Sequence, residues 1–268
     1  MGGRVHPTAV VDTAAELADD VEVGPYAVVG PDVRAGAGVR IHGHAMVEGH
    51  TELGEGVEVF PFAVIGQRPQ DKKYDGGPSH VVVGARSVLR EYVTVHPSST
   101  KGRATVIGAD VLVMAYCHVA HDCQIGDGVV MANAVQLAGH CEVHPKAVLG
   151  GLTNVHQFAR IGRLAMTGAA ARVSRDVPPF ALVDGHPARF VGSNVVGLRR
   201  AGVPEETRRA LKRAFRALFS TSRNERSGVL EAEAEAVPEV QELMAFARES
   251  ERGLTRPRRR RAVEPRDA

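Results

Sequence analysis

The sequence predicts an all-β solenoid of short stacked strands, followed by a small α-helical domain. Three observations predict this arrangement: a six-residue repeat of aliphatic residues, a second set of small residues four positions after each of them, and a change to helical spacing near residue 203. A strict period of six fits neither the 3.6-residue period of a helix nor the two-residue period of an ordinary strand. It does fit a repeating unit made of one short strand and one corner.

The first run of the repeat begins at Val5 and has no polar residue at its aliphatic position. Its members are Val5, Val11, Leu17, Val23, Val29, Ala35, Ile41, Val47, Leu53, Val59 and Ile65. The smaller set consists of Ala9, Ala15, Val21, Ala27, Val33, Val39, Ala45, Thr51, Val57 and Ala63. Gly and Asp tolerate the unusual dihedral angles of a corner. Three such units close a coil of about 18 residues, and stacked coils bury one continuous apolar column.

A second run begins at Ile107 and continues to Val173, with Thr167 as the single polar member. Between the two runs, Val83, Leu89 and Val95 keep the same period. The alternative is an antiparallel sandwich of short strands. We disfavour it because the strands of a sandwich do not hold one phase over so many consecutive units.

The segment YCHVAHDCQIGDG, residues 116–128, has the composition of a zinc site. However, Cys117, Cys123 and Cys141 all occupy the small inward position, where a free cysteine behaves as a compact hydrophobic residue. The nearby histidines avoid both inward positions and should face outward; they are His118, His121, His140, His144 and His156. We therefore expect no Cys/His zinc site. The candidate functional residues are His121 and His140 on successive coils, beside Asp122.

Two insertions interrupt the repeat, near residues 66–82 and 96–105. Insertions in a solenoid form loops on one side, which is often the binding side. The first insertion contains a dense polar group, QDKKY at 70–74. A solvated surface loop would have the same composition, but long loops in compact domains are frequently functional.

The C-terminal part has helical spacing of its apolar residues. Residues 203–220 predict an amphipathic helix with Pro204 in its first turn and a basic outer face, and residues 228–250 predict further helix interrupted at Pro238. We assign the solenoid to 1–192, a helical domain that can cap the open column to 193–254, and a basic disordered tail to 255–268.

The overall composition excludes several classes of protein. A formal net charge of +2 does not favour nucleic acid as a partner, and no apolar run is long enough for an integral membrane segment. Three cysteines without a secreted context indicate a reducing compartment. We expect a soluble cytoplasmic protein.

Several motifs, in order along the chain, resemble those of the UDP-N-acetylglucosamine acyltransferases, within the hexapeptide-repeat acyltransferases: QRPQDKKYDG, HVAHDC, LAGHCEV, NVHQF, DVPPFALVDGHPA and GLRR. The resemblance extends to about residue 254. It implies a left-handed parallel β-helix that forms a homotrimer with active sites between subunits. It also implies transfer of a (3-hydroxy)acyl chain from acyl carrier protein to the 3-position of UDP-GlcNAc, the first step of lipid A biosynthesis, without metal or cofactor.

The resemblance also implies roles for individual residues. His121 matches the general base, Asp122 is a plausible partner that orients it, and the backbone N–H of Gly139 matches the oxyanion donor. Ala169 matches the position that limits acyl chain length and suggests a medium or slightly shortened chain. The implied substrate-binding residues are Gln70, Asp71, Lys73, His118, His140, His156, Gln157, Asn194 and Arg200.

The chain departs from the family pattern at three places. It has HPSS at 96–99 where many relatives have HRGT, and Val196 and Ala201 stand where some relatives have Glu and Arg. We therefore expect the contacts near His96 and the nucleotide contacts to differ from those of the family. Separately, the sequence leaves open whether the acceptor is the 3-hydroxyl of GlcNAc or the amine of a 3-amino analogue, and whether the acyl chain bears a 3-hydroxyl.

Three other classes remain as alternatives. An N-acyltransferase acting on the next acylated sugar would carry a uridine-binding domain before the solenoid, whereas the repeat here begins at Val5. A γ-carbonic-anhydrase-like zinc enzyme could use His118, His121 and His140 as ligands. A scaffold that has lost activity is the third.

Overall fold

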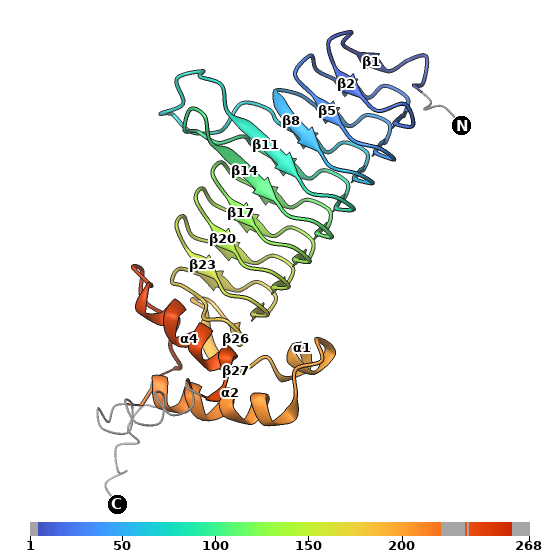
Figure 1. Cartoon of the computed structure of the whole chain (residues 1–268). Helices are drawn as coiled ribbons and strands as arrows, with labels where there is room; N and C mark the ends of the chain where they lie inside the picture. The colour runs from blue at the N-terminus through green and yellow to red at the C-terminus, as the bar shows by residue number, and fades with distance from the viewer. Residues whose placement is uncertain (1–4, 221–233, 235, 259–268) are drawn as a thin grey trace, which may run out of the picture.

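The computed structural model describes residues 5–220, 234 and 236–258. The chain winds into a three-sided solenoid whose sides are three parallel sheets, and the helices gather at its C-terminal end (Figure 1). The first sheet contains β1 (Val10–Val11), β4 (Val28–Val29), β7 (Met46–Val47), β10 (Val64–Ile65), β13 (Thr94–Val95), β16 (His118–Val119), β19 (Gln136–Leu137), β22 (Asn154–Val155) and β25 (Arg172–Val173).

The second sheet contains β2 (Glu16–Leu17), β5 (Arg34–Ala35), β8 (His50–Leu53), β11 (His80–Val83), β14 (Ala104–Ile107), β17 (Gln124–Ile125), β20 (Glu142–Val143) and β23 (Arg160–Ile161). The third sheet contains β3 (Glu22–Val23), β6 (Arg40–Ile41), β9 (Glu58–Val59), β12 (Val88–Leu89), β15 (Leu112–Val113), β18 (Val130–Met131), β21 (Val148–Leu149), β24 (Met166–Thr167), β26 (Ala181–Asp184) and β27 (Arg189–Ser193). The predicted solenoid is confirmed.

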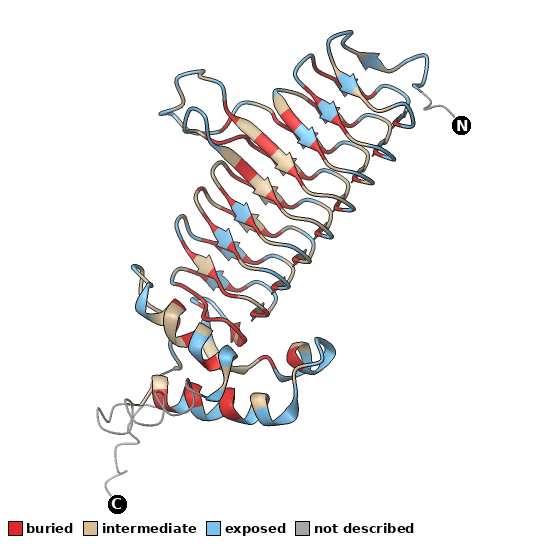
Figure 2. Ribbon diagram, viewed as in Figure 1, coloured by how far each residue is buried: buried red, intermediate tan, exposed pale blue. Residues whose placement is uncertain are grey.

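Both inward positions of the repeat form the core. The aliphatic positions from Val23 to Ile65 and the small positions from Val21 to Ala63 are buried, and the buried residues run as a column inside the sheets (Figure 2). Val5 is 52% exposed because the column is open at this end. The inward polar residues have hydrogen-bond partners: the Thr51 hydroxyl donates to the Glu48 carbonyl, and the Thr153 and Thr167 hydroxyls bond each other at 2.8 Å. These hydroxyls are thus satisfied inside the column.

The three cysteines are free and buried in this column, as the repeat predicts. Burial raises the pKa of Cys117 to about 11, which leaves the thiol protonated at neutral pH. The Cys141 Sγ lies 3.3 Å from the His156 carbonyl, not from a histidine ring. These thiols belong to the core.

The corner between the third and first sheets carries a column of stacked rings. Consecutive ring centroids lie 4.8–5.2 Å apart, and each residue has a positive φ. The rings belong to Tyr26, His44, Phe62, Tyr92 and Tyr116. We call this edge the aromatic corner.

The C-terminal end of the column is closed by a hairpin and helices. Strands β26 and β27 pair antiparallel, which ends the parallel coil. Helix α1 (Val195–Arg200) buries Leu198, and α2 (Glu205–Leu218) packs Phe215 on Phe190 of the hairpin, with ring centroids 4.8 Å apart. Helix α4 (Pro238–Arg248) lies beside the last coils, where Arg163 pairs with Glu242 at 2.7 Å.

The C-terminal segment was predicted to be helix interrupted at Pro238. Residues 234 and 236 are helical, Val237 is not, and Pro238 begins α4, where a proline needs no N–H partner in the first turn. One detail differs from the sequence-based expectation. The predicted disordered tail is wrong for its first residues: Thr255 is buried and its N–H donates to the Asp176 carbonyl, and residues 259–268 lie outside the described part. In the described part of the chain, no helix is long and apolar enough to cross a membrane. The cytoplasmic location stays a prediction.

Candidate active site

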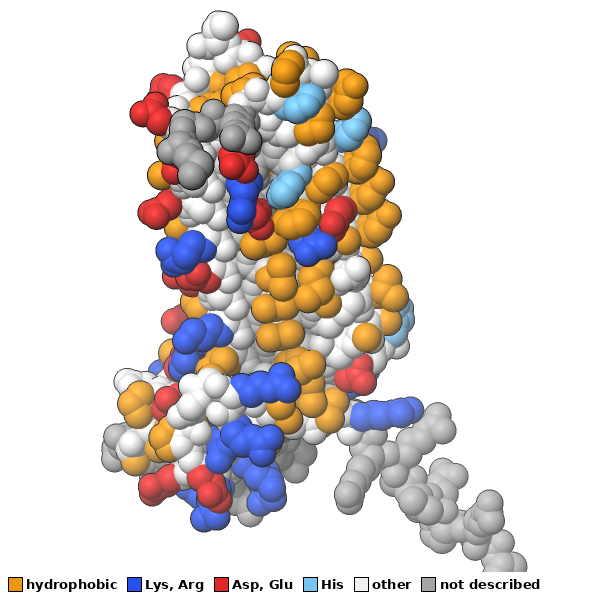
Figure 3. All heavy atoms as spheres, turned by 90° about the vertical axis from the view of Figure 1, so that its right-hand side faces the viewer, with side chains coloured by type: hydrophobic (Ala, Val, Ile, Leu, Met, Phe, Trp, Pro, Cys, Tyr) orange, Lys and Arg blue, Asp and Glu red, His pale blue; other side chains and the backbone are white. Residues whose placement is uncertain are grey.

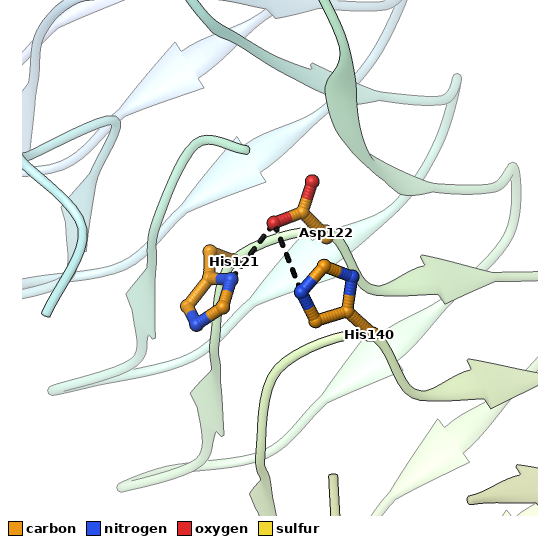
Figure 4. Close-up of side chains that lie close together, drawn as sticks. All are labelled: His121, Asp122 and His140. Atoms are coloured by element: carbon orange, nitrogen blue, oxygen red, sulfur yellow. Dashed lines mark hydrogen bonds and ion pairs between the residues drawn. The ribbon is translucent and has the colours of Figure 1, made fainter. Parts of the chain in front are cut away.

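The candidate site lies at the corner between the first and second sheets, which we call the His121 corner. His121 and Asp122 lie between β16 and β17, and His140 lies one coil further, between β19 and β20. The two inserted loops leave the same corner, since one follows β10 and the other follows β13. Stacking of the coils therefore brings both loops and the predicted catalytic residues to one edge of the solenoid. Figure 4 shows His121 and His140 on either side of the Asp122 carboxylate.

Asp122 is the best-connected side chain of the site. Its Oδ2 accepts from the His121 Nδ1 at 2.8 Å, from the Ser99 N–H at 3.1 Å and from the Ser99 hydroxyl at 2.9 Å. Its Oδ1 accepts from the Ser98 hydroxyl. Burial of the carboxylate would raise its pKa, but the hydrogen bonds from Ser98, His121 and Ser99 outweigh burial and lower the pKa of Asp122 to about 2. Asp122 is therefore a carboxylate at neutral pH.

This ionised partner fixes the tautomer of His121. A carboxylate only accepts hydrogen bonds, so the Nδ1 of His121 must carry the proton. In the neutral ring, the Nε2 then carries a lone pair. This atom points toward the first inserted loop, where the Asp71 Oδ2 lies 3.8 Å away. The His121 side chain is 12% exposed.

Gly139 lies directly against the His121 ring. A Cβ at this position would lie 2.5 Å from Cε1 and 2.6 Å from Nε2 of His121, distances that no side chain can occupy. Among the hydrogen bonds of the described residues, none uses the Gly139 N–H. Because Gly139 is buried, bulk water does not replace the missing partner. Its N–H is therefore an unpaired donor next to the His121 ring.

His140 completes the group. Its Nε2 lies 3.7 Å from the Asp122 Oδ2, its ring meets that of His121 edge-on, and it stacks on Phe158 at 4.7 Å between centroids. Asp122 and His140 both have positive φ, near 62° and 59°, a conformation that Asp and His tolerate better than most residues. The corner thus turns two polar side chains toward one point.

The residues brought together can be tested against the zinc alternative. Ligand atoms of His121, Asp122 and His140 lie within 4.8 Å of one another, which is close enough to share a cation. The third histidine of the zinc alternative, His118, instead bonds the Thr94 hydroxyl at 2.7 Å. Burial, then the nearby His121, lowers the pKa of His118. The arrangement therefore does not reproduce a three-histidine site within one chain.

The first inserted loop is held by its own short contacts. The Asp71 Oδ1 accepts from the Lys73 N–H at 3.0 Å, while the Gln70 and Lys73 side chains are exposed. The Gln70 N–H donates to the Nδ1 of the buried His96 at 3.3 Å. Burial, followed by the charges of His118 and His121, lowers the pKa of His96 to about 4, so the ring is neutral and can accept this bond.

A groove of about 630 Å³ extends the site toward the helical end. It is lined by Asp122, His140, Phe158, Arg160, Asp176 and Arg252, among others. His156 is exposed near this groove, with its Nδ1 3.2 Å from Arg252, and the neighbouring Gln157 is half-buried. These two predicted substrate-binding residues therefore lie on the His121 corner, two coils below the base.

Three predicted residues lie elsewhere. Ala169 is exposed at the end of the aromatic corner, and Arg200 is exposed at the end of α1. Asn194 is buried and caps α1: its Oδ1 accepts from the Gly197 N–H and its Nδ2 donates to the Leu164 carbonyl. Four strand spacings separate β15, in the coil of His121, from β26, or about 19 Å along the axis. One chain does not bring these residues to its own His121.

Sequence reasoning missed Ser98 and Ser99 as part of the site. The segment HPSS at 96–99 has no pattern that indicates which residues its serines contact. In the structure the two serines bond the Asp122 carboxylate on the next coil.

Comparisons with known proteins identify the family. Residues 176–255 match the family described as Udp N-acetylglucosamine O-acyltransferase, Domain 2, and residues 104–139 match the bacterial transferase hexapeptide repeats. The chain is 44% identical over 259 residues to the acyl-[acyl-carrier-protein]–UDP-N-acetylglucosamine O-acyltransferase of Thiobacillus denitrificans, covering 94% of this chain and 99% of the relative. It is 46% identical over 256 residues to the enzyme of that name from Alkalilimnicola ehrlichii, with the same coverage.

Solved structures show the same likeness. The UDP-N-acetylglucosamine acyltransferase of Campylobacter jejuni is 35% identical, with a TM-score of 0.88, over 95% of this chain and 100% of that one. LpxA of Acinetobacter baumannii is 35% identical, with a TM-score of 0.88, over 94% and 99%. The shared fold is the left-handed parallel β-helix. The chain belongs to the family of the acyl-[acyl-carrier-protein]–UDP-N-acetylglucosamine O-acyltransferases.

Proposed function

We propose that the protein transfers an acyl chain from acyl carrier protein to the 3-position of UDP-GlcNAc, the first step of lipid A biosynthesis. One observation carries the proposal: His121 is held by an ionised Asp122 through Nδ1, with its Nε2 beside the free N–H of Gly139. A thioester is already an activated acyl donor. What the reaction lacks is a base for the weakly acidic sugar hydroxyl and a donor for the developing oxyanion.

The base and the oxyanion donor both act in the addition step. The Nε2 of His121 accepts the proton of the 3-hydroxyl as the sugar oxygen attacks the thioester carbonyl carbon. The carbonyl oxygen takes up negative charge and accepts the Gly139 N–H. Collapse of this intermediate breaks the carbon–sulfur bond, and the departing thiolate takes the proton from the imidazolium. Asp122 stabilises the imidazolium throughout and keeps its own charge, in line with its low pKa.

The donor partner fits the charge of the helical end. Helix α2 carries basic residues on its outer face: Arg208, Arg209, Lys212, Arg213 and Arg216. Lys and Arg side chains gather at this end of the molecule in Figure 3. Acyl carrier proteins are strongly acidic, so complementary charge would steer the donor to this surface.

We propose a homotrimer with each site shared between neighbouring copies. The outward face of the third sheet is an apolar column of half-buried residues in register: Val88, Leu112, Val130, Val148, Met166 and Leu182. Figure 3 shows hydrophobic side chains gathered along the solenoid on this side. By contrast, the second sheet turns charged residues such as Arg34, Glu52 and Glu142 outward. An apolar face of this length favours cover by another copy.

The position of α1 supports the same assembly. In Figure 1 the first inserted loop projects from the left of the solenoid, whereas α1 lies to the right of its lower end. Arg200, predicted to contact the nucleotide, and Asp71, predicted to contact the sugar, therefore lie on different sides of one chain. They can meet only across an interface between copies.

A product assay tests the function. The purified protein is incubated with UDP-GlcNAc and a series of acyl carrier protein thioesters of increasing chain length, beside His121→Ala. We expect a mass-identified UDP-3-O-acyl-GlcNAc that falls by roughly 10²- to 10⁴-fold in the variant. The chain length of the preferred donor also tests the role of Ala169, where transfer of chains of 16 carbons or more would contradict our expectation.

Failure of this assay would point to a specific alternative. Product only with the 3-amino sugar would identify an N-acyltransferase that uses the same base. No product with either sugar, together with one zinc per chain by metal analysis, would favour the zinc enzyme. No product and no zinc would favour the scaffold.

A further inference from the structure

We infer that Ser98 and Ser99, on the second inserted loop, are positioning residues that orient the base through Asp122. The inference rests on the proposed function, since it assigns a role in that reaction. It arises from the segment HPSS at 96–99, which lies in the second inserted loop. The two serines do not touch His121; they act on the carboxylate that holds it.

Four donors hold the Asp122 carboxylate, three on Oδ2 and one on Oδ1. They are the Ser99 hydroxyl, the Ser99 N–H and the His121 Nδ1–H on Oδ2, and the Ser98 hydroxyl on Oδ1. Three of the four come from the second loop, so this loop rather than the coil sets the direction of the carboxylate.

The serines are themselves held in place. Ser98 is fully buried and its Oγ accepts the Thr100 N–H at 2.9 Å. Its hydroxyl lies within hydrogen-bond distance of two acceptors, the Asp122 Oδ1 and the Thr100 carbonyl at 3.0 Å, and the charged carboxylate is the stronger of the two. The backbone N–H of Asp122 donates to the Thr105 hydroxyl at 2.9 Å, which fixes the other end of the residue. Asp122 has a positive φ, a conformation that needs support from its surroundings. The loop supplies that support on the side-chain side.

Ser99 also lies close to the sugar-side loop. The Lys73 N–H, followed by the charge of His121 and the nearby Ser99 hydroxyl, lowers the pKa of the Asp71 carboxyl, while the hydroxyl itself bonds Asp122. The second loop thus lies between the residue predicted to contact the sugar and the residue that orients the base.

The test measures kcat and KM for Ser98→Ala, Ser99→Ala and the double variant. We expect the double variant to lose roughly 10- to 100-fold in kcat, the effect of removing hydrogen bonds to a charged group, with KM changed by less than about threefold. Ser99→Thr keeps the hydroxyl and should restore most of the activity. Ser87→Ala is the matched control: this buried serine bonds the Gly108 carbonyl and the Val111 N–H at another corner, so kcat should not change.

A double-mutant cycle separates positioning from general loss of structure. If the serines act through Asp122, the Ser98→Ala/Ser99→Ala changes should have little further effect on kcat in an Asp122→Asn background. An equal loss in both backgrounds, or unchanged kcat in the serine double variant, would overturn the inference.

An activity-independent readout distinguishes this failure from failure of the proposed function. Imidazole ¹⁵N chemical shifts report whether Nδ1 or Nε2 of His121 carries the proton. We expect the Nδ1–H tautomer in the wild type and a mixture in the serine double variant. The same tautomer in both proteins would overturn the inference even if the acyl transfer is observed. A tautomer change in a protein that acylates neither sugar would reject only the function.

Discussion

Single residues at the His121 corner act by constraining one another more than by their individual reactivity. Asp122 carries a charge because four donors surround it, and that charge decides which nitrogen of His121 holds the proton. Gly139 contributes by having no side chain, since the His121 ring occupies the space a Cβ would need. The chemistry therefore depends on neighbours that never exchange a proton.

Gly139→Ala should inactivate the enzyme without unfolding it. The added methyl would lie about 2.5 Å from the ring of His121, so the base must move away from the position set by Asp122. We expect kcat to fall by roughly 100-fold or more, because misplacement of a catalytic group by about 1 Å has effects of this size. Gly192→Ala is the control, since its Cβ would meet no atom within 4 Å. Wild-type kcat in Gly139→Ala would show that the ring tolerates displacement.

At the scale of elements, the two inserted loops join the regular coil to the site. The coil gives each residue a fixed inward or outward direction, whereas the loops have no repeat to define them. Their placement rests on a few contacts: the Gln70 N–H on His96, and the serines on Asp122. The first of these contacts requires a neutral His96, because a protonated ring has no acceptor.

His96 should make the fold sensitive to mild acid. Its pKa is about 4 in the folded protein and about 6.5 in the unfolded chain, so the unfolded chain binds more protons between these values. The stability it contributes is complete above pH 6.5 and is lost as the pH falls toward 4. At pH 5 we expect a loss of about 1–2 kcal/mol, allowing for solvent screening. Urea unfolding at pH 7.5 and pH 5.0 measures it.

His96→Asn serves as the comparison, because Asn keeps an acceptor but does not titrate. His118 and His144, whose pKa values burial also lowers, remain in both proteins and contribute the same sign. The difference between the two proteins therefore isolates His96. An equal decline in stability from pH 7.5 to 5.0 would show that His96 does not titrate between the folded and unfolded states.

Two polar residues of helix α1 have different expected roles: Asn194 stabilises the helix, and Arg200 is predicted to bind substrate. Both polar atoms of Asn194 have partners within the chain, whereas Arg200 is exposed at the end of the helix. We expect Asn194→Ala to lower stability by roughly 0.5–2 kcal/mol, the usual effect of losing an N-cap. Arg200→Ala should leave thermal stability unchanged and raise KM for UDP-GlcNAc. Thermal unfolding and steady-state kinetics on both variants test this division, and the opposite pattern would reverse the two roles.

At the scale of the whole molecule, the repeat predicted the solenoid, while its left hand came only from the family resemblance. The inward phases placed the three cysteines in the core and the histidines outside it, and both are observed. The period says nothing about contacts made by the irregular loops, so the serines on Asp122 could not be predicted. Nor did it predict that Thr255 packs against the last coil, because a single added strand-like contact has no periodic signal. Local sequence patterns therefore predict whether a side chain points into or out of the column, whereas its hydrogen-bond partners depend on how the coils and loops assemble.

The shared site of the proposed trimer can be tested by mixing two inactive variants. His121→Ala removes the base from one chain, and Arg200→Glu removes the predicted nucleotide contact from α1. If each site takes His121 from one copy and Arg200 from its neighbour, random mixed trimers should contain intact sites. Unfolding and refolding an equal mixture should then restore about one quarter of the wild-type activity per site, since one neighbour pairing in four joins the two intact residues.

The two variants refolded separately are the control and should stay inactive. Light scattering on the same samples reports whether trimers have formed. Trimers without restored activity would mean that each chain supplies both residues to its own site. That outcome would conflict with their separation by about 19 Å along the axis and would require α1 to lie elsewhere in the assembly. Restoration would show that the apolar face of the third sheet brings the α1 of one copy to the His121 corner of the next.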